Sequence, residues 1–355
     1  MSRPTVLAFR HSTGLGGMGR AADFFTPVLQ SSCRVVAVVP LSAKRVGSMH
    51  VAAAWPAKAT AAVGAVLRCT SALATKSPKA VYLPIAQWGL PLLRDSLIVV
   101  LARIFNCSIV LHLHGSQLPD RLASSWALRK TLERSHWLVL SETVAAAVDA
   151  AGCRAASVHV IRNPAPTGGT PREVAEASSR TGRPLRIGWI GTMHSQKGFD
   201  ILCDAVARLK RAGAPVSFAV AGLRSDVSTS RMACVDEDLG VLEPVDVLSF
   251  WTRIDVFVLP ARWAEGLPFV LLEGLQAGCA VAATWSAGSA ELFSRGCVER
   301  IGSDVDSVTA FLRVCMTDID GVRQRQQKLW RELRPLYDPD RVEASFAEFW
   351  QEADL

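Results

Sequence analysis

The chain lacks the sequence features of several protein classes. Its 9 cysteines form no Cys-x-x-Cys pair, and because their number is odd they cannot all pair with one another. No segment reaches the roughly 20 uninterrupted apolar residues of a membrane-spanning helix. The long apolar stretch of a signal peptide is also missing after Met1. We therefore expect reduced thiols, most of them in the core, and a cytoplasmic protein.

The composition is that of a well-filled globular protein. Of the 355 residues, 50% are hydrophobic and 20% are charged, which argues against a disordered or fibrous chain. The length exceeds that of an ordinary single domain and favours two. Residues 164–171 are dense in proline and glycine and indicate the linker. We place the domains at residues 1–166 and 167–337.

Positive charge is concentrated in the first half of the chain. Residues 1–170 contain 18 Lys and Arg against 6 Asp and Glu, whereas residues 171–355 contain 21 against 26. A basic surface attracts a phosphate-bearing substrate, an anionic membrane or nucleic acid. The chain has no zinc-ligand spacing, aromatic RNA-binding signature or recognition-helix pattern, so we expect no nucleic acid among its partners. An anionic membrane surface stays a hypothesis, with contacts through Lys44, Arg45, Lys58 and Arg68, and a merely solvated basic face is the alternative.

Both halves begin with a strand, a glycine-containing loop and a helix. In the first half, residues 5–9 precede the loop at 14–19, and in the second, residues 185–190 precede the loop at 191–198. The backbone N–H groups at such a helix start suit a phosphate. Helical patterns separate most of the later β-type runs, which predicts an α/β fold with parallel sheets. These runs are residues 35–39, 80–83, 109–112, 137–140, 217–220, 256–259 and 280–283.

The first glycine loop also matches the Gly-x-Gly-x-x-Gly pattern of dinucleotide-binding proteins. Such proteins carry an acidic residue about 20 positions later, which binds the ribose of NAD. This chain has Lys44 and Arg45 there instead, which would suit the additional phosphate of NADP. An NADP-dependent oxidoreductase is therefore a remote hypothesis, and it leaves the second half of the chain without a role.

Glu265 and Glu273 bracket the most informative segment. Residues 254–260 form an apolar run typical of a buried strand, Pro268 suits the first position of a helix, and Gly278 suits the residue just past its end. We therefore predict a helix from about 268 to about 277, with Glu265 in the loop before it.

That loop lies where open α/β sheets bind their ligands. The N–H groups of Gly266 and Leu267 suit a phosphate or a sugar edge, and the carboxylate of Glu265 can accept hydrogen bonds from hydroxyls. Glu273 lies in an apolar helix and needs a partner. Two glutamates at this spacing also occur by chance, so the spacing alone does not decide the function.

Several segments together resemble the family 4 glycosyltransferases, retaining enzymes of the GT-B fold. In the second half, residues 191–200 resemble the donor-phosphate loop, and residues 255–260 the strand that leads into the Glu-x7-Glu segment. In the first half, residues 111–116 resemble the active-site histidine segment. The resemblance implies two Rossmann-like domains facing across a cleft, an acceptor domain first and a donor domain second. It also implies that a C-terminal amphipathic helix, at about 338–355, crosses back to the first domain.

The resemblance further implies transfer of a sugar from a nucleotide diphosphate sugar to a glycan or lipid-linked acceptor, with retention and without a metal or other cofactor. Lys197 would neutralise the diphosphate, Glu265 would hold hydroxyls of the donor sugar, and His114 would contact that sugar near the reacting centre. Glu273 would bind the nucleotide ribose. The other donor-binding residues would be Gly16, Gly17, Gly191, Thr192, Gly266, Leu267 and Pro268. A noncatalytic GT-B protein that binds a nucleotide sugar or a glycan is the alternative.

Two sequence features depart from what this family needs. Members often carry an arginine a few residues before the lysine, whereas this chain has Thr192, Met193 and His194. Arg262, Arg224 and Arg10 are candidates for the missing cation. Asp-x-Asp pairs bind a divalent ion in a different glycosyltransferase fold, but here we expect them to cap helices or lie on the surface, because none directly follows a long apolar strand. They are Asp236/Asp238, Asp304/Asp306, Asp318/Asp320 and Asp338/Asp340.

Overall fold

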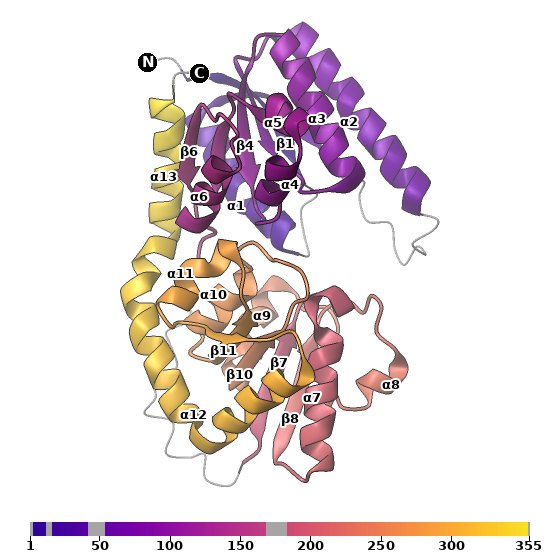
Figure 1. Ribbon diagram of the computed structural model, residues 1–355, viewed down its shortest axis with the longest axis vertical. Helices are drawn as coiled ribbons and strands as arrows, with labels where there is room; N and C mark the ends of the chain where they lie inside the picture. Colours follow the sequence, from indigo (N-terminus) through magenta and orange to yellow (C-terminus); the bar gives the residue numbers. More distant parts are fainter. Residues whose placement is uncertain (1–2, 12–15, 42–53, 168–182, 354–355) are drawn as a thin grey trace. The chain divides into compact units, whose positions relative to one another are not determined.

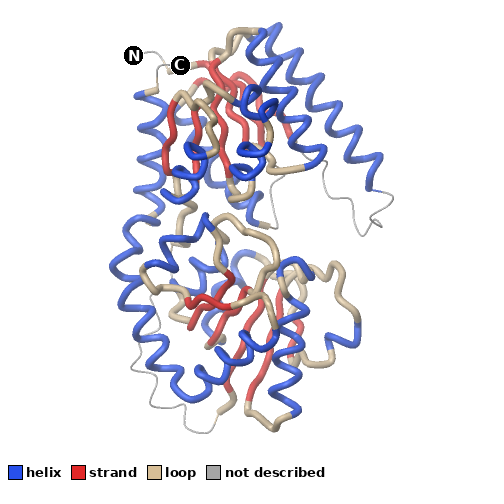
Figure 2. Tube along the Cα trace, viewed as in Figure 1, coloured by secondary structure: helices blue, strands red, loops and turns tan. Residues whose placement is uncertain are grey.

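The computed structural model describes residues 3–11, 16–41, 54–167 and 183–353. The chain divides into two compact units, one formed by residues 1–163 with 340–355 and the other by residues 164–339. Each unit is built on its own parallel sheet (Figures 1 and 2).

The first unit has six parallel strands in the order β2-β1-β3-β4-β5-β6. Its strands are β1 (Thr5–Arg10), β2 (Arg34–Pro40), β3 (Ala80–Pro84), β4 (Ser108–Leu113), β5 (His136–Val139) and β6 (Ser157–Val160). Its helices are α1 (Gly17–Ser32), α2 (Ala54–Lys76), α3 (Gly89–Ile104), α4 (Leu118–Ser124), α5 (Trp126–Leu132), α6 (Glu142–Ala150) and α13 (Pro339–Glu352). The strand order reverses between β1 and β3, so right-handed crossovers place α1 on one face of the sheet and the helices from α2 to α6 on the other.

Helix α13 belongs to the first unit, as predicted for the C-terminal segment. The ring of Phe346 lies 5.0 Å from that of Phe25 in α1 and 5.9 Å from that of Tyr82 in β3. The ring of Phe349 lies 5.0 Å from that of His159 in β6. Because these aromatic side chains recur on one face of the helix, α13 covers the sheet on the same face as α1.

The second unit repeats the plan with the strand order β12-β11-β10-β7-β8-β9. Its strands are β7 (Leu185–Ile190), β8 (Val216–Ala221), β9 (Glu237–Asp238), β10 (Val256–Leu259), β11 (Ala280–Thr284) and β12 (Glu299–Ile301). Its α-helices are α7 (Phe199–Arg211), α8 (Thr229–Met232), α9 (Pro244–Arg253), α10 (Phe269–Gln276), α11 (Ala290–Ser294) and α12 (Val305–Leu333), and its 3-10 helices are η2 (Ser195–Lys197), η3 (Ala287–Ser289) and η4 (Arg334–Tyr337).

Every β-type run predicted from the sequence corresponds to a strand, and the predicted and observed bounds agree within two residues. The predicted Glu-x7-Glu helix is confirmed as α10, but it begins at Phe269 rather than at Pro268. The ψ angle of Pro268 is 126°, which is extended, so this residue precedes the helix and does not form its first turn. Gly278 follows the helix end with a φ of 77°, as expected for the residue after a helix.

Candidate active site

The strand order of the second unit reverses between β7 and β10, which are parallel neighbours. Ligands of open α/β sheets bind at such a reversal, beyond the carboxyl ends of the strands. Two loops leave the sheet at that point, residues 191–198 after β7 and residues 260–268 after β10. These are the two segments that the sequence singled out, so the fold places most of the predicted donor residues at one edge of one sheet.

The predicted carboxylate and cation lie next to each other in these loops. The Nζ atom of Lys197 is 3.5 Å from Oε1 of Glu265. The same Glu265 oxygen accepts a hydrogen bond of 2.7 Å from the indole Nε1 of Trp263. The ring of His194 stacks on that indole, with centroids 5.9 Å apart and an interplanar angle of 14°. Trp263 was not among the site residues predicted from the sequence. The sequence feature that could have indicated it is its position two residues before Glu265.

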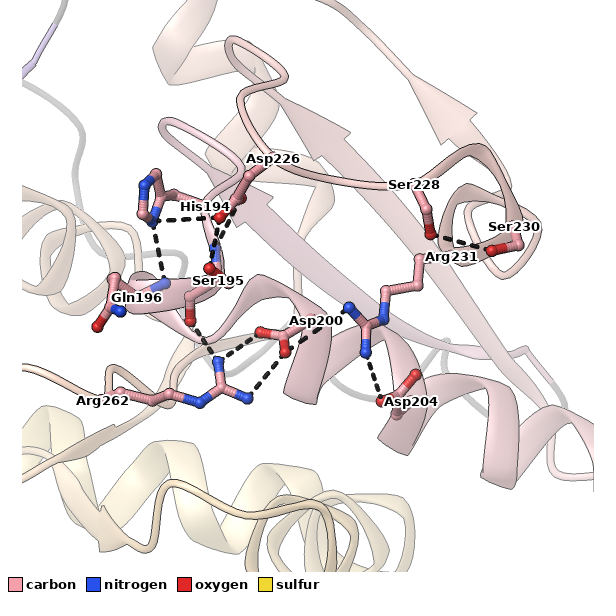
Figure 3. Close-up of polar contacts among 10 residues, drawn as sticks. All are labelled: His194, Ser195, Gln196, Asp200, Asp204, Asp226, Ser228, Ser230, Arg231 and Arg262. Carbon is pink, nitrogen blue, oxygen red and sulfur yellow. Dashed lines mark hydrogen bonds and ion pairs between the residues drawn. The ribbon is translucent and has the colours of Figure 1, made fainter. Parts of the chain in front are cut away.

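The segment that carries Lys197, residues 194–198, is here called the Lys197 turn. Arg262 holds it from the other loop: its guanidinium donates to the carbonyl of Ser195, and its backbone N–H donates to the carbonyl of Gln196 at 2.9 Å. The guanidinium also binds both carboxylate oxygens of Asp200, at 2.7 and 2.8 Å (Figure 3). Burial is the largest single effect on Asp200 and favours a higher pKa, but the hydrogen bonds from Arg262 together with the charges of Arg262 and Arg231 outweigh it, so the pKa of this carboxyl is lowered.

Two further contacts hold the same turn. Asp226 accepts hydrogen bonds from the backbone N–H of Ser195, at 2.9 Å, and from its hydroxyl (Figure 3). Gly198 has a φ of 77°, and a Cβ atom there would lie 2.0 Å from the carbonyl oxygen of Pro260. Only glycine therefore allows the turn to pack so closely against the end of β10.

These contacts bear on the missing arginine. Met193 is fully buried, so its side chain does not face a ligand. Arg262 is paired with Asp200, Arg224 with Asp238, and Arg10 with Asp23 in the first unit. Of the two candidate cations in the second unit, Arg262 contacts the Lys197 turn, and it does so as a support of the backbone.

Gly266 is held by its carbonyl group. The hydroxyls of Ser286 and Ser289 both donate to it, at 3.1 and 3.0 Å. Gly288 lies against the same peptide, because a Cβ atom on Gly288 would be 2.4 Å from the carbonyl carbon of Gly266. The orientation of the peptide next to Glu265 is therefore set by the loop after β11.

Glu273 is buried in α10 and has the partner that its position required. Its Oε2 atom accepts a hydrogen bond of 3.0 Å from the indole of Trp251, in α9. Its assigned role at the nucleotide ribose stays a prediction.

His114 follows β4 in the first unit, and its ring lies 3.9 Å from that of His112 and 6.0 Å from that of Phe25. Asn163 makes a side-chain hydrogen bond to it. Burial, with a smaller effect of His11, lowers the pKa of His114 to about 3. Its imidazole is therefore neutral near pH 7. The buried Nδ1 atom of His114 has no hydrogen-bond partner among the described residues.

Gly16 precedes α1 with a φ of 121°, and Gly17 is the first residue of that helix. Met18 from the same helix start lines a narrow cavity together with His11 and His114. The first unit thus brings His114 close to the beginning of α1. Residues 12–15 of the glycine loop lie outside the described residues, as do Lys44 and Arg45.

The Asp-x-Asp residues have structural partners where the structure shows them. Asp304 caps α12 by accepting from the backbone N–H of Ser307 at 2.8 Å. Asp236 binds Lys210 at 2.6 Å, and Asp238 binds Arg224. Within the described ranges, no three His, Cys, Asp or Glu side chains gather as a metal site would need, and no helix is long and apolar enough to cross a membrane. The prediction that no metal is used stays a prediction.

Comparison with known proteins gives a consistent class. Residues 184–317 match the family model described as glycosyl transferases group 1. An uncharacterized 42.6 kDa protein in the cps region of Klebsiella pneumoniae is 31% identical over 108 residues, which cover 30% of this chain and 28% of that protein. The aligned stretch is thus less than a third of that relative.

Solved structures match along nearly the whole chain. Anabaena HepE, solved in complex with UDP-glucose, has a TM-score of 0.66 and 15% identity over 99% of this chain and 100% of its own. Sucrose-phosphate synthase from Thermosynechococcus elongatus has a TM-score of 0.71 and 12% identity over 99% of each chain. The protein has the fold of GT-B glycosyltransferases, and its residues 184–317 match the model of the group 1 glycosyltransferases, as the sequence resemblance predicted.

Proposed function

We propose that the protein is a retaining glycosyltransferase that moves a sugar from a nucleotide diphosphate sugar to a glycan or lipid-linked acceptor. The observation that carries the proposal is the pairing of Lys197 with Glu265, 3.5 Å apart, where the strand order of the second unit reverses. One group suits a diphosphate and the other suits sugar hydroxyls. The relative in a Klebsiella cps region supports a role in cell-surface polysaccharide synthesis.

Charge is the central problem of this reaction, because the leaving nucleotide diphosphate gains negative charge as the sugar becomes oxocarbenium-like. Groups already held in place stabilise that charge most, since they need no reorganisation. Lys197 fits this role because Arg262 and Asp226 hold the turn that carries it. In the free protein its ammonium is paired with Glu265, so donor binding would exchange this ion pair for contacts to the diphosphate and the sugar.

His114 would act as a hydrogen-bonding group. Because its pKa is about 3, it is not a cation at neutral pH. Its Nδ1 atom, which has no hydrogen-bond partner among the described residues, can hydrogen-bond to a sugar hydroxyl near the reacting centre. In the proposed mechanism the leaving phosphate takes the proton of the acceptor, so no protein nucleophile is needed, and no metal is required.

The first test is a calorimetric screen of the parent protein against UDP, GDP, ADP and their nucleotide sugars. We expect binding of one nucleotide series, followed by steady-state release of that nucleotide when acceptor glycans are added. Glu265→Ala should lower turnover by roughly a hundredfold or more, with the thermal midpoint unchanged. Arg208→Gln is the matched control, because Arg208 pairs with Asp306 on the exposed surface of the same unit.

Three results would count against the proposal in different ways. Binding without turnover would favour a noncatalytic nucleotide-sugar protein. Binding of NADPH without any nucleotide sugar would favour the oxidoreductase. Full turnover in Glu265→Ala would contradict the site assignment while leaving the class intact.

A further inference from the structure

Helix α3 of the first unit exposes an unbroken apolar stripe. Leu93, Leu97, Val100 and Ile104 recur at helical spacing, and their exposed fractions are 66%, 46%, 41% and 70%. The opposite side of the helix packs on the sheet through buried residues that include Ile98, Val99 and Ala102. The stripe therefore lies on the outer side of α3. The outer side of a surface helix in a soluble protein is normally polar.

The neighbouring helices extend this surface. Helix α2 packs beside α3 and exposes Val63 (60%) and Leu67 (65%), also at helical spacing. Helix α5 packs on α3 as well, and its Trp126 is 71% exposed. These helices lie along one side of the first unit in Figure 1. We call the seven residues the α3 face: Val63, Leu67, Leu93, Leu97, Val100, Ile104 and Trp126. Contiguous apolar surface of this kind marks an interaction site in a soluble protein.

The exposed charges on these helices are of one sign. The sequences of α2, α3 and α5 contain a single acidic residue, Asp95. Asp95 is buried and binds Arg94 and the backbone N–H of Ala86. The exposed charges of the three helices are therefore cationic: among them are Arg68, next to Leu67, Lys76 at the end of α2, and Lys130. Lys130 is paired with Glu133, which lies just past α5.

An apolar stripe with cations and without exposed carboxylates fits an anionic bilayer. Apolar side chains enter the boundary between headgroups and acyl chains, while Lys and Arg remain at the phosphates. A second copy of the chain is a poor match, because the same face would bring Arg68 and Lys76 towards like charges without acidic partners. We propose that the α3 face docks the protein on an anionic lipid surface. The proposal rests on the proposed function in one respect, since a lipid-linked acceptor would lie in that surface.

The test uses the full chain and two kinds of vesicle, phosphatidylcholine alone and an equal mixture of phosphatidylcholine and phosphatidylglycerol. We expect the parent to sediment with the mixed vesicles and to bind them less as salt is added. Leu97→Glu combined with Ile104→Glu should lower the binding constant by roughly tenfold or more, because two apolar contacts are lost. Arg68→Gln should lower it by roughly fivefold.

Matched controls come from the second unit. Val245 and Val314 are also exposed on helices, at 81% and 52%, and Val245→Glu with Val314→Glu makes the same change in charge and hydropathy. We expect this variant to bind vesicles as the parent does. A positional readout comes from Trp126: quenching of tryptophan fluorescence by brominated lipid should fall when Trp126→Phe is introduced.

Several outcomes would overturn the inference. These are a parent that does not bind the mixed vesicles, equal loss in the two Glu variants, or quenching that does not depend on Trp126. A dimer in light scattering that dissociates in the Leu97→Glu variant would assign the α3 face to a second copy. Vesicle binding needs no nucleotide, so its failure is distinct from failure of the nucleotide-sugar screen.

Discussion

Acid should destabilise the first unit through histidines that are held neutral in its interior. Burial lowers the pKa of His114 to about 3 and, with a smaller effect of Arg94, that of His11 to about 4. Burial also places the pKa of His112 well below its usual value. In the unfolded chain each would titrate near 6.5. Below that pH the unfolded state binds more protons than the folded state, so the free energy of unfolding falls as the pH falls.

The size of the effect follows from the shift. At pH 5 an unfolded histidine is almost fully protonated while folded His114 is still neutral, which costs about 2 kcal/mol of stability for this residue. His11 contributes a similar amount, so the two together account for about 4 kcal/mol between pH 7.5 and pH 5. This loss is a large share of the stability of a typical domain.

The assay is urea unfolding at pH 7.5 and pH 5, with hydrogen exchange of peptides from β4 reporting on the first unit. His114→Gln removes one titrating group, so the stability difference between the two pH values should shrink by about 2 kcal/mol relative to the parent. An equal pH dependence in the parent and His114→Gln would refute the reasoning, as would an NMR titration of His114 with a midpoint near 6.5.

Three further predictions concern the support of the site and of the first unit. Trp263→Phe keeps the ring beside His194 but loses the hydrogen bond to Glu265, so we expect roughly tenfold weaker binding of the nucleotide sugar and unchanged binding of the nucleoside diphosphate. Arg262→Gln should weaken the binding of both ligands because it loosens the Lys197 turn. Calorimetry with the two ligands separates these effects, and identical losses in both variants would contradict them. Gly288→Ala should displace the Gly266 peptide and weaken donor binding by roughly tenfold or more, while Gly64→Ala on α2 should not change it. Phe346→Ala should lower the free energy of unfolding of the first unit by about 3 to 5 kcal/mol, against a change within about 0.5 kcal/mol for the exposed Glu348→Ala in urea unfolding.

The strands missed in the sequence show where pattern reasoning fails. β6, β9 and β12 are all edge strands of their sheets, and β9 is only two residues long, Glu237–Asp238. An edge strand has one unpaired side and needs no continuous apolar run. The fourth edge strand, β2, has such a run and was recognised at residues 35–39, whereas β6, β9 and β12 lack one and do not stand out. The central strands are buried on both faces, and their β-branched runs were recognisable for that reason.

The same distinction applies to the site. The loops after β7 and β10 could be predicted because a glycine, a helix start and a charged side chain occur together in each. The residues that support the site could not be predicted, because they are distant in sequence from the residues they hold. Trp251 is 22 residues from Glu273, and Asp200 is 62 residues from Arg262. Such pairs depend on which helix packs against which loop, and neither partner carries a local pattern.

The absence of an arginine before Lys197 has a structural consequence. Met193 is buried at that position, and the cation that the sequence suggested as a substitute, Arg262, is committed to Asp200 and to the backbone of the Lys197 turn. A guanidinium bound at both carboxylate oxygens cannot turn to a ligand without leaving Asp200 with fewer partners, which costs free energy. Lys197 is therefore the cation of this turn placed beside Glu265, and Arg262 contributes by fixing the position of the backbone that carries this lysine. A second lysine in place of Arg262 would carry the same charge but could not bridge Asp200 and Ser195 with the same geometry, so charge alone should not restore donor binding.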